Sequence, residues 1–163
     1  MFVILIIISS FTINPVVKGI DAIKDHKTTK LISNIAKKDK GYWLATDSPV
    51  FAGYVLACGA RVANATNFYP DYGKWKLIDP KKKNDESYNR YANMTVNLTK
   101  EKTEFSIITP DLLKVHLNYQ DLKKLNIKYI FTIKDLKNDF DDENIDNELL
   151  YEDGRIYIYR LKW

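Results

Sequence analysis

Apolar and polar residues change their spacing several times along this chain, which predicts a series of short helices and strands. Over residues 16–35 the apolar side chains recur at helical intervals with lysines between them, so we expect an amphipathic helix packed on a sheet. Residues 42–46 have a strand-like composition. They lead into Asp47-Ser48-Pro49, which is typical of a helix start, because Asp or Ser can cap free amides and proline suits the first helical position. A short apolar helix over residues 51–58 should then end at Gly59.

The second half of the chain favours strands. Alternating apolar and polar residues over 113–117 predict a half-buried strand, and the apolar, β-branched run over 127–133 predicts a central one. Asn118 is placed to cap a short helix over residues 119–125. Shorter strands are expected at residues 61–63, 95–98 and 104–108.

The C-terminal residues have the clearest hairpin pattern. Asp153-Gly154 lies between the apolar stretches 149–152 and 155–161, and Asp-Gly supplies the positive φ angles that a two-residue turn needs. The acidic residues 135–148 before the hairpin are expected to be exposed. Strands that alternate with short helices predict an α/β fold: a mixed β-sheet sandwiched by short helices, with a C-terminal β-hairpin.

Composition and charge restrict the class of protein. The 163 residues are 45% hydrophobic, which predicts one globular domain with a substantial core. The net charge of +4 is not spread evenly, because residues 18–40 carry seven lysines and three aspartates whereas residues 135–153 carry nine acidic groups and one lysine. The lysines at 81–83 are followed by Asp85 and Glu86, as in a solvated loop. We therefore expect no nucleic-acid partner.

Residues 1–14 differ from the rest because they carry no charged side chain and begin with a continuous apolar run. Uncharged residues continue from Phe2 to Ile13, fewer than the ~20 that cross a bilayer as a helix. No basic side chain precedes the run, as a signal peptide would require. We interpret residues 1–14 as the end of a transmembrane segment and residues 15–163 as a single extracytoplasmic domain; a buried core element is the alternative. The lysines after the run favour a cytoplasmic side, although the positive-inside rule weakens for long domains.

Sequence motifs for catalysis are absent. The chain has no glycine-rich phosphate loop, no G-x-S-x-G, no H-E-x-x-H and no C-x-x-C. His26 and His116 are far apart and lack metal-ligand spacing, and the single Cys58 lies in an apolar helix where a packed thiol is expected. No catalytic residue, metal or cofactor is predicted.

Two clusters that mix aromatic and polar side chains are the candidate ligand site. Sugars bind by stacking on aromatic faces and by hydrogen bonds to amide, carboxylate and guanidinium groups, and both clusters hold such groups. The alternative is that the rings pack the rim of the core while Asp71 and Arg90 form a structural pair. The predicted ligand-binding residues are Asn67, Tyr69, Asp71 and Trp75 in the first cluster, and Tyr88, Asn89 and Arg90 in the second.

Three short N-glycosylation patterns also occur, beginning at Asn64, Asn93 and Asn97. Such patterns arise often by chance in a chain rich in asparagine.

Three landmarks resemble a known group of membrane proteins. They are the apolar end running into residues 14–19 (NPVVKG), residues 53–71, and residues 122–130 closed by residues 156–159. Together they resemble the C-terminal extracytoplasmic part of polytopic bacterial membrane proteins of the GT-C glycosyltransferase type, including YfhO-like proteins. The resemblance implies a domain that follows the last transmembrane helix of a longer protein using a lipid-linked sugar donor. The catalytic acid of such enzymes lies in an early outer loop that no part of this chain matches, so the chain should be inactive alone.

These observations lead to one expected function and two alternatives. We expect a soluble accessory domain of an integral membrane protein, on the outer side of the cell membrane, that helps bind acceptor glycan. The first alternative is a free-standing, membrane-anchored module that binds a surface polysaccharide. The second is a soluble intracellular α/β protein in which residues 2–8 form a core strand.

Overall fold

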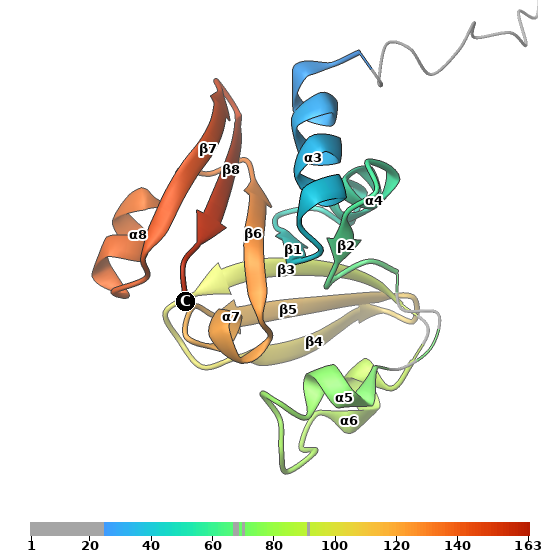
Figure 1. The fold of residues 1–163 in the computed structure, drawn as a ribbon. Helices are drawn as coiled ribbons and strands as arrows, with labels where there is room; N and C mark the ends of the chain where they lie inside the picture. The colour runs from blue at the N-terminus through green and yellow to red at the C-terminus, as the bar shows by residue number, and fades with distance from the viewer. Residues whose placement is uncertain (1–24, 67–68, 70, 91) are drawn as a thin grey trace, which may run out of the picture.

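The computed structural model describes residues 25–66, 69, 71–90 and 92–163, which form two β-sheets with helices around them (Figure 1). The expected membrane segment, residues 1–14, lies outside the described residues, as does Asn67 of the candidate site. The predicted α/β class, with mixed sheet, short helices and a C-terminal hairpin, is confirmed.

The larger sheet has five strands and is mixed. In spatial order the strands are β2 (Arg61–Val62), β1 (Tyr42–Ala45), β6 (Ile127–Thr132), β8 (Ile156–Leu161) and β7 (Asn147–Asp153). The strands β2, β1 and β6 run parallel, whereas β8 is antiparallel to β6 and β7 is antiparallel to β8. The middle strand, β6, is buried at five of its six positions, as predicted for a central strand.

Two helices, α3 (Lys27–Lys38) and α4 (Pro49–Ala57), pack on one face of this sheet. The α4 helix begins as its sequence predicts, because the Ser48 side chain accepts a hydrogen bond from an amide of the first turn and a proline follows. It ends at Ala57 with Cys58 as its C-cap, and Gly59 then takes a φ of +88°, a conformation that favours glycine. The α3 helix begins at Lys27 and ends at Lys38, three residues after the last apolar position of the predicted repeat; residues 16–24 of the predicted helix lie outside the described residues.

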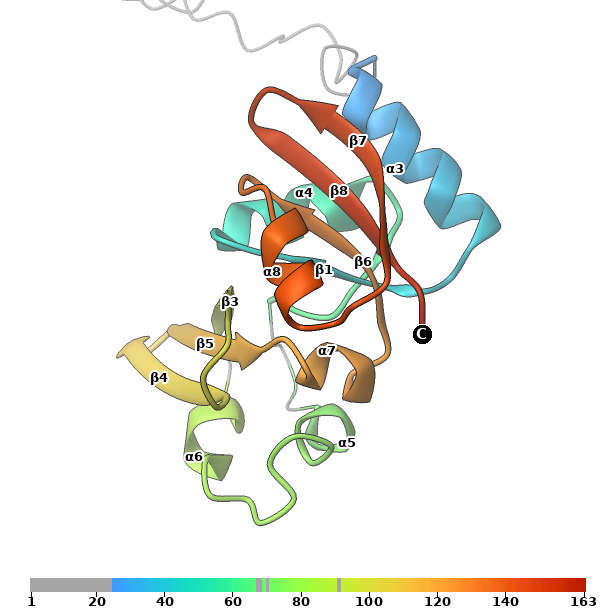
Figure 2. The ribbon, with the colours of Figure 1, turned by 90° about the vertical axis from the view of Figure 1, so that its left-hand side faces the viewer.

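The remaining strands form a second sheet, which the sequence did not separate from the first. In order it contains β3 (Asn93–Thr99), β5 (Leu112–Asn118) and β4 (Glu104–Thr109). This sheet covers the opposite face of the larger one, and Val96 and Val115 pack in one core with Leu44 and Ile130. Figures 1 and 2 both show it beneath the larger sheet, with α5 (Tyr72–Trp75) and α6 (Asp85–Tyr88) on its outer side.

Three local predictions are corrected. The acidic segment 135–148 is not fully exposed, because α8 (Lys137–Asp142) buries Phe140 completely against Tyr159. The helix expected over 119–125 is the shorter α7 (Asp121–Lys124), and Asn118 instead accepts a hydrogen bond from the Gln120 amide. The hairpin turn is formed by Gly154 and Arg155, one residue later than expected, since Asp153 is still paired with Ile156.

Candidate functional site

The fold brings the two predicted aromatic clusters together. Trp75 on α5 and Tyr88 on α6 have ring centroids 6.1 Å apart, and Phe105 of β4 meets the Trp75 ring edge-on at 5.3 Å. Trp75 is 2% exposed and Tyr88 0% exposed, so their faces are enclosed by protein. In this arrangement both rings pack the core, which agrees with the alternative interpretation as far as the rings are concerned.

The polar members of the clusters remain at the surface. Tyr69 is 87% exposed and Asn89 is also exposed. The Arg90 guanidinium donates to the Glu86 carbonyl at 3.1 and 2.9 Å. The ligand-binding role given to these three residues stays a prediction.

Asp79 fixes the loop that joins α5 to α6. Its buried carboxylate accepts from the backbone amides of Lys83 and Asn84, at 3.0 and 2.7 Å, and from the Tyr88 hydroxyl at 3.4 Å. Burial alone would raise the pKa of Asp79, but the hydrogen bonds from the two amides, the Asn84 side chain and the Tyr88 hydroxyl together outweigh it and hold the pKa below its ordinary value. This network reverses the direction of the chain, so that α6 lies beside α5.

Lys74 of α5 is a lysine that the fold removes from water. Its side chain is 19% exposed. The ammonium nitrogen donates to the Ala63 carbonyl at 2.6 Å, lies 4.6 Å from the centre of the Trp75 ring, and is 3.9 Å from an Asp71 carboxylate oxygen. Burial lowers the pKa of Lys74, and Asp71 opposes this only in part.

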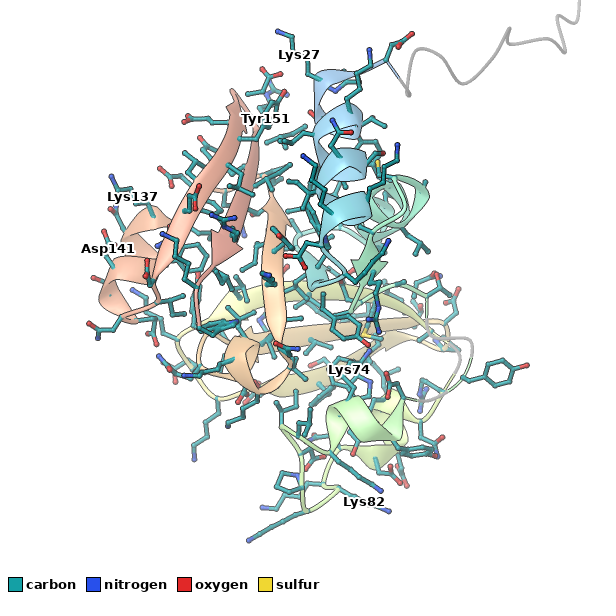
Figure 3. All side chains as sticks on the ribbon, in the orientation of Figure 1. Lys27, Lys74, Lys82, Lys137, Asp141 and Tyr151 are labelled. Atoms are coloured by element: carbon teal, nitrogen blue, oxygen red, sulfur yellow. The ribbon has the colours of Figure 1, made fainter. Side chains whose placement is uncertain are left out.

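Lys74 and Asp71 line a cavity of about 300 Å³ between α5, the start of β1 and the end of α7. Tyr42 also lines it, with the Arg61 guanidinium 4.4 Å from its ring centre. Lys124 supplies a second ammonium group, which is paired with Asp121 at 2.7 Å. Figure 3 shows Lys74 between α5 and the sheets, whereas Lys82 projects from the loop at the bottom of the view.

Of the predicted residues that the structure describes, Asp71 is therefore the one that lines this cavity, and the Trp75 ring lies against the Lys74 ammonium group. Asp71 also caps α5, because its other oxygen accepts from the Lys74 amide at 3.1 Å. Sequence reasoning missed Lys74, since a lysine between Gly73 and Trp75 looks like any solvated residue. The spacing of three between Asp71 and Lys74 was the available signal.

A second buried charge lies at the other end of the larger sheet. Asp47 follows β1 with a φ of +72°, and its side chain is 10% exposed. It accepts from the hydroxyls of Thr46 and Thr132, at 2.7 and 3.1 Å, and pairs with Lys134 at 2.8 Å. Burial would raise the pKa of Asp47, but Lys134 and the hydroxyls lower it below its ordinary value.

This position is where the fold type would lead one to look for a ligand. The parallel strands β1 and β6 are neighbours, and their connections enter helices on opposite faces, α4 and α8. Open α/β sheets bind ligands at such a point, outside the carboxyl ends of the strands. Here the Asp47 carboxylate is already bonded on both oxygens, so it serves to join the two strand ends.

Three other residues singled out in the sequence are explained by their contacts within the fold. Asn64 is buried, and its side-chain amide pairs with both the amide and the carbonyl of Ala45, at 3.1 and 2.7 Å, so it cannot carry a glycan in this fold. Cys58 is a buried free thiol whose pKa is raised by burial. His26 caps α3 by accepting from the Thr28 amide. Within the described ranges, no three His, Cys, Asp or Glu side chains are grouped to hold a metal ion.

The family model described as "Domain of unknown function (DUF7654)" matches residues 22–162, so the chain belongs to this family. No match was found among curated proteins or among solved structures.

Proposed function

We propose that this member of the family is a non-catalytic accessory domain of an integral membrane protein that resembles lipid-linked-sugar-dependent glycosyltransferases. It is held at the outer side of the cell membrane by residues 1–14 and helps bind acceptor glycan. The proposal has two parts: membrane attachment through residues 1–14, and glycan binding in the cavity beside Lys74.

The observation that carries the proposal is the separation of the apolar run from the domain. The family match begins at residue 22, after the run has ended at residue 13. Among the residues that the structure describes, no helix is both long and apolar enough to cross a bilayer. Membrane attachment in this proposal therefore rests on residues 1–14 and on segments of the parent protein.

The end of the domain at which the described chain starts has an apolar surface. Val50, at the start of α4, is 72% exposed, and a groove of about 390 Å³ opens beside it, lined by Phe51, Phe131 and Ile156. His26, next to the first described residue, lines the same groove. Figure 1 shows the start of α3 and the tip of the β7–β8 hairpin at this end, and Figure 3 places Lys27 and Tyr151 there. Exposed apolar side chains near the first described residue are consistent with the proposal that this end of the domain faces the bilayer.

The support for glycan binding is the chemistry of the Lys74 cavity. Sugars need hydrogen-bond acceptors and donors for their hydroxyls, together with apolar groups for their C–H faces. Asp71 and Lys74 supply the first kind of group, and Tyr42, Leu77 and Leu125 supply the second.

Membrane attachment is tested by making the full chain in the presence of phospholipid vesicles and extracting with alkaline carbonate. We expect the natural chain to stay with the vesicles and the double variant Leu5→Asp/Ile7→Asp to be released, because charges in the apolar run oppose insertion. Equal release of both chains contradicts the membrane part of the proposal. Circular dichroism of both chains checks that the domain itself stays folded.

A further inference from the structure

We infer that the cavity beside Lys74 binds a uronic acid unit, a sugar carrying a carboxylate, with Lys74 contacting that carboxylate and Asp71 accepting from a sugar hydroxyl. This inference rests on the proposed function, since it names the class of glycan that the domain recognises. It follows from three features of the cavity: a poorly compensated cation, a neighbouring anion and an apolar wall.

The cation is the Lys74 ammonium group. An ammonium has three N–H donors, and the Ala63 carbonyl takes one of them at 2.6 Å. Of the carboxylates in the described part of the chain, Asp71 alone pairs with it, at 3.9 Å, which is too long for a hydrogen bond. A carboxylate bound in the cavity would supply the partner that the protein does not.

The anion, Asp71, decides which kind of acid fits. A carboxylate only accepts hydrogen bonds, and the Asp71 side chain is 55% exposed, so it can reach a ligand. Its charge opposes every anion, and it opposes phosphate, with about 1.5–2 negative charges near neutral pH, more than a uronate with one. It also accepts hydrogen bonds from the hydroxyls that a sugar carries. A sugar acid carries both a carboxylate for Lys74 and hydroxyls for Asp71, so it satisfies the two residues at once.

The size and the wall of the cavity suit one sugar ring. A volume of about 300 Å³ is at the small end of ligand pockets. Tyr42, Leu77 and Leu125 offer apolar surface to the C–H face of a ring. Lys124 lines the same cavity and adds positive charge, although Asp121 already pairs with it.

The experiment is a titration of the full chain in detergent micelles with glucuronic acid, glucose and inorganic phosphate, followed by heteronuclear NMR. We expect glucuronate to bind about tenfold more tightly than glucose, and Lys74→Met to remove that preference, since one ion-assisted contact is worth about this factor. Asp71→Asn, which keeps a capping side chain on α5, should weaken both sugars. Lys81→Met, which removes an exposed loop lysine, is the matched control and should change nothing.

Each outcome has a definite meaning. Equal binding of glucose and glucuronate, unchanged in Lys74→Met, overturns the acidic ligand but leaves the glycan part of the proposed function standing. Tightest binding of phosphate overturns the sugar. Binding of none of the three to the folded natural chain overturns the inference, while the carbonate extraction decides membrane attachment independently. If Lys74→Met fails to fold, Lys74→Arg, which keeps the positive charge, should retain the preference for glucuronate; its loss there counts against the inference.

Discussion

Asp47 and Lys74 are both charged side chains withdrawn from water, but their surroundings differ. Asp47 receives two hydroxyl hydrogen bonds and a lysine at 2.8 Å. Lys74 has one carbonyl at 2.6 Å, the Trp75 ring centre at 4.6 Å and a carboxylate at 3.9 Å. One charge is compensated within the protein and the other is compensated only in part.

The direction of each pKa expresses this difference. Burial acts against the charged form of Asp47, yet its partners outweigh burial, and a pKa below the ordinary value means that the carboxylate form is favoured. Burial prevails at Lys74, and a pKa below the ordinary value there means that the ammonium form is disfavoured. The compensated charge of Asp47 joins strands, whereas the poorly compensated charge of Lys74 lies at the cavity for which we propose a ligand.

The largest effect should come from the ring beneath Lys74. Trp75→Ala removes a fully packed indole and should lower the free energy of unfolding by about 3–5 kcal/mol. Tyr69→Ala, a change of an exposed aromatic from the same predicted cluster, should alter it by less than about 0.5 kcal/mol. Urea denaturation of both variants measures this. Similar losses in the two would contradict the core position of Trp75.

The next largest loss of stability should come from removing the compensated charge, Asp47. Asp47→Ala leaves the buried Thr46 and Thr132 hydroxyls without their shared acceptor, and should cost about 2–3 kcal/mol, because Lys134 is exposed and can be solvated instead. Asp142→Ala breaks an exposed ion pair with Lys100 and serves as the control, with an expected change below about 1 kcal/mol. If the two variants unfold at the same urea concentration, Asp47 does not join the strands as described.

A second compensated carboxylate makes stability depend on pH. Its hydrogen bond with Lys128 is the main reason why the pKa of Asp39 is lowered from 3.8 to about 2, and the Gly41 amide and Tyr129 add to it. A carboxyl with a lowered pKa in the folded state stabilises above its unfolded pKa, and this contribution is lost as the pH falls from about 4 to about 2.

Urea unfolding at pH 5 and pH 2.5 should therefore show a loss that is smaller, by about 1 kcal/mol, in Asp39→Asn than in the natural chain. The amide cannot titrate, which is why the variant should lose less. An identical loss in both chains would mean that Asp39 contributes nothing in this pH range.

The smallest stability effect should come from the poorly compensated charge. Lys74→Met keeps the apolar stem over Trp75 and removes a buried cation, so the free energy of unfolding should stay within about 1 kcal/mol of the natural value or rise. Thermal and urea unfolding measure it. A loss as large as that of Asp47→Ala would make Lys74 a structural residue and remove the contrast between the two charges.

Features that depend on neighbouring residues were predictable from the sequence. The start of α4 depends on Ser48 and Pro49, and its end on Gly59, all local signals. The hairpin was predicted from Asp153-Gly154 and is present, with its turn one residue later. Its register is set by packing of the strands on the sheet, which the two turn residues do not determine.

Features that depend on distant residues were not predictable. The separate three-stranded sheet arises because β3 pairs with β5, although β4 lies between them in the sequence. Phe140 is buried inside an acidic segment because Tyr119 and Tyr159 meet it from other elements. Lys74 becomes enclosed only when Ala63, eleven residues earlier, lies over it. Asp71 was predicted as a ligand residue because its type suits a sugar site wherever it is placed; it lines the cavity, and its ligand-binding role stays a prediction.

The most direct test of the account is an NMR titration of the Lys74 side chain in the full-length protein, assigned by comparison with Lys74→Met. Without ligand, the pKa of Lys74 should lie below its ordinary value. Addition of glucuronate should raise that pKa, because a bound carboxylate favours the ammonium form, and addition of glucose should leave it unchanged. An unchanged pKa in saturating glucuronate would contradict the claim that Lys74 is the ligand-binding cation.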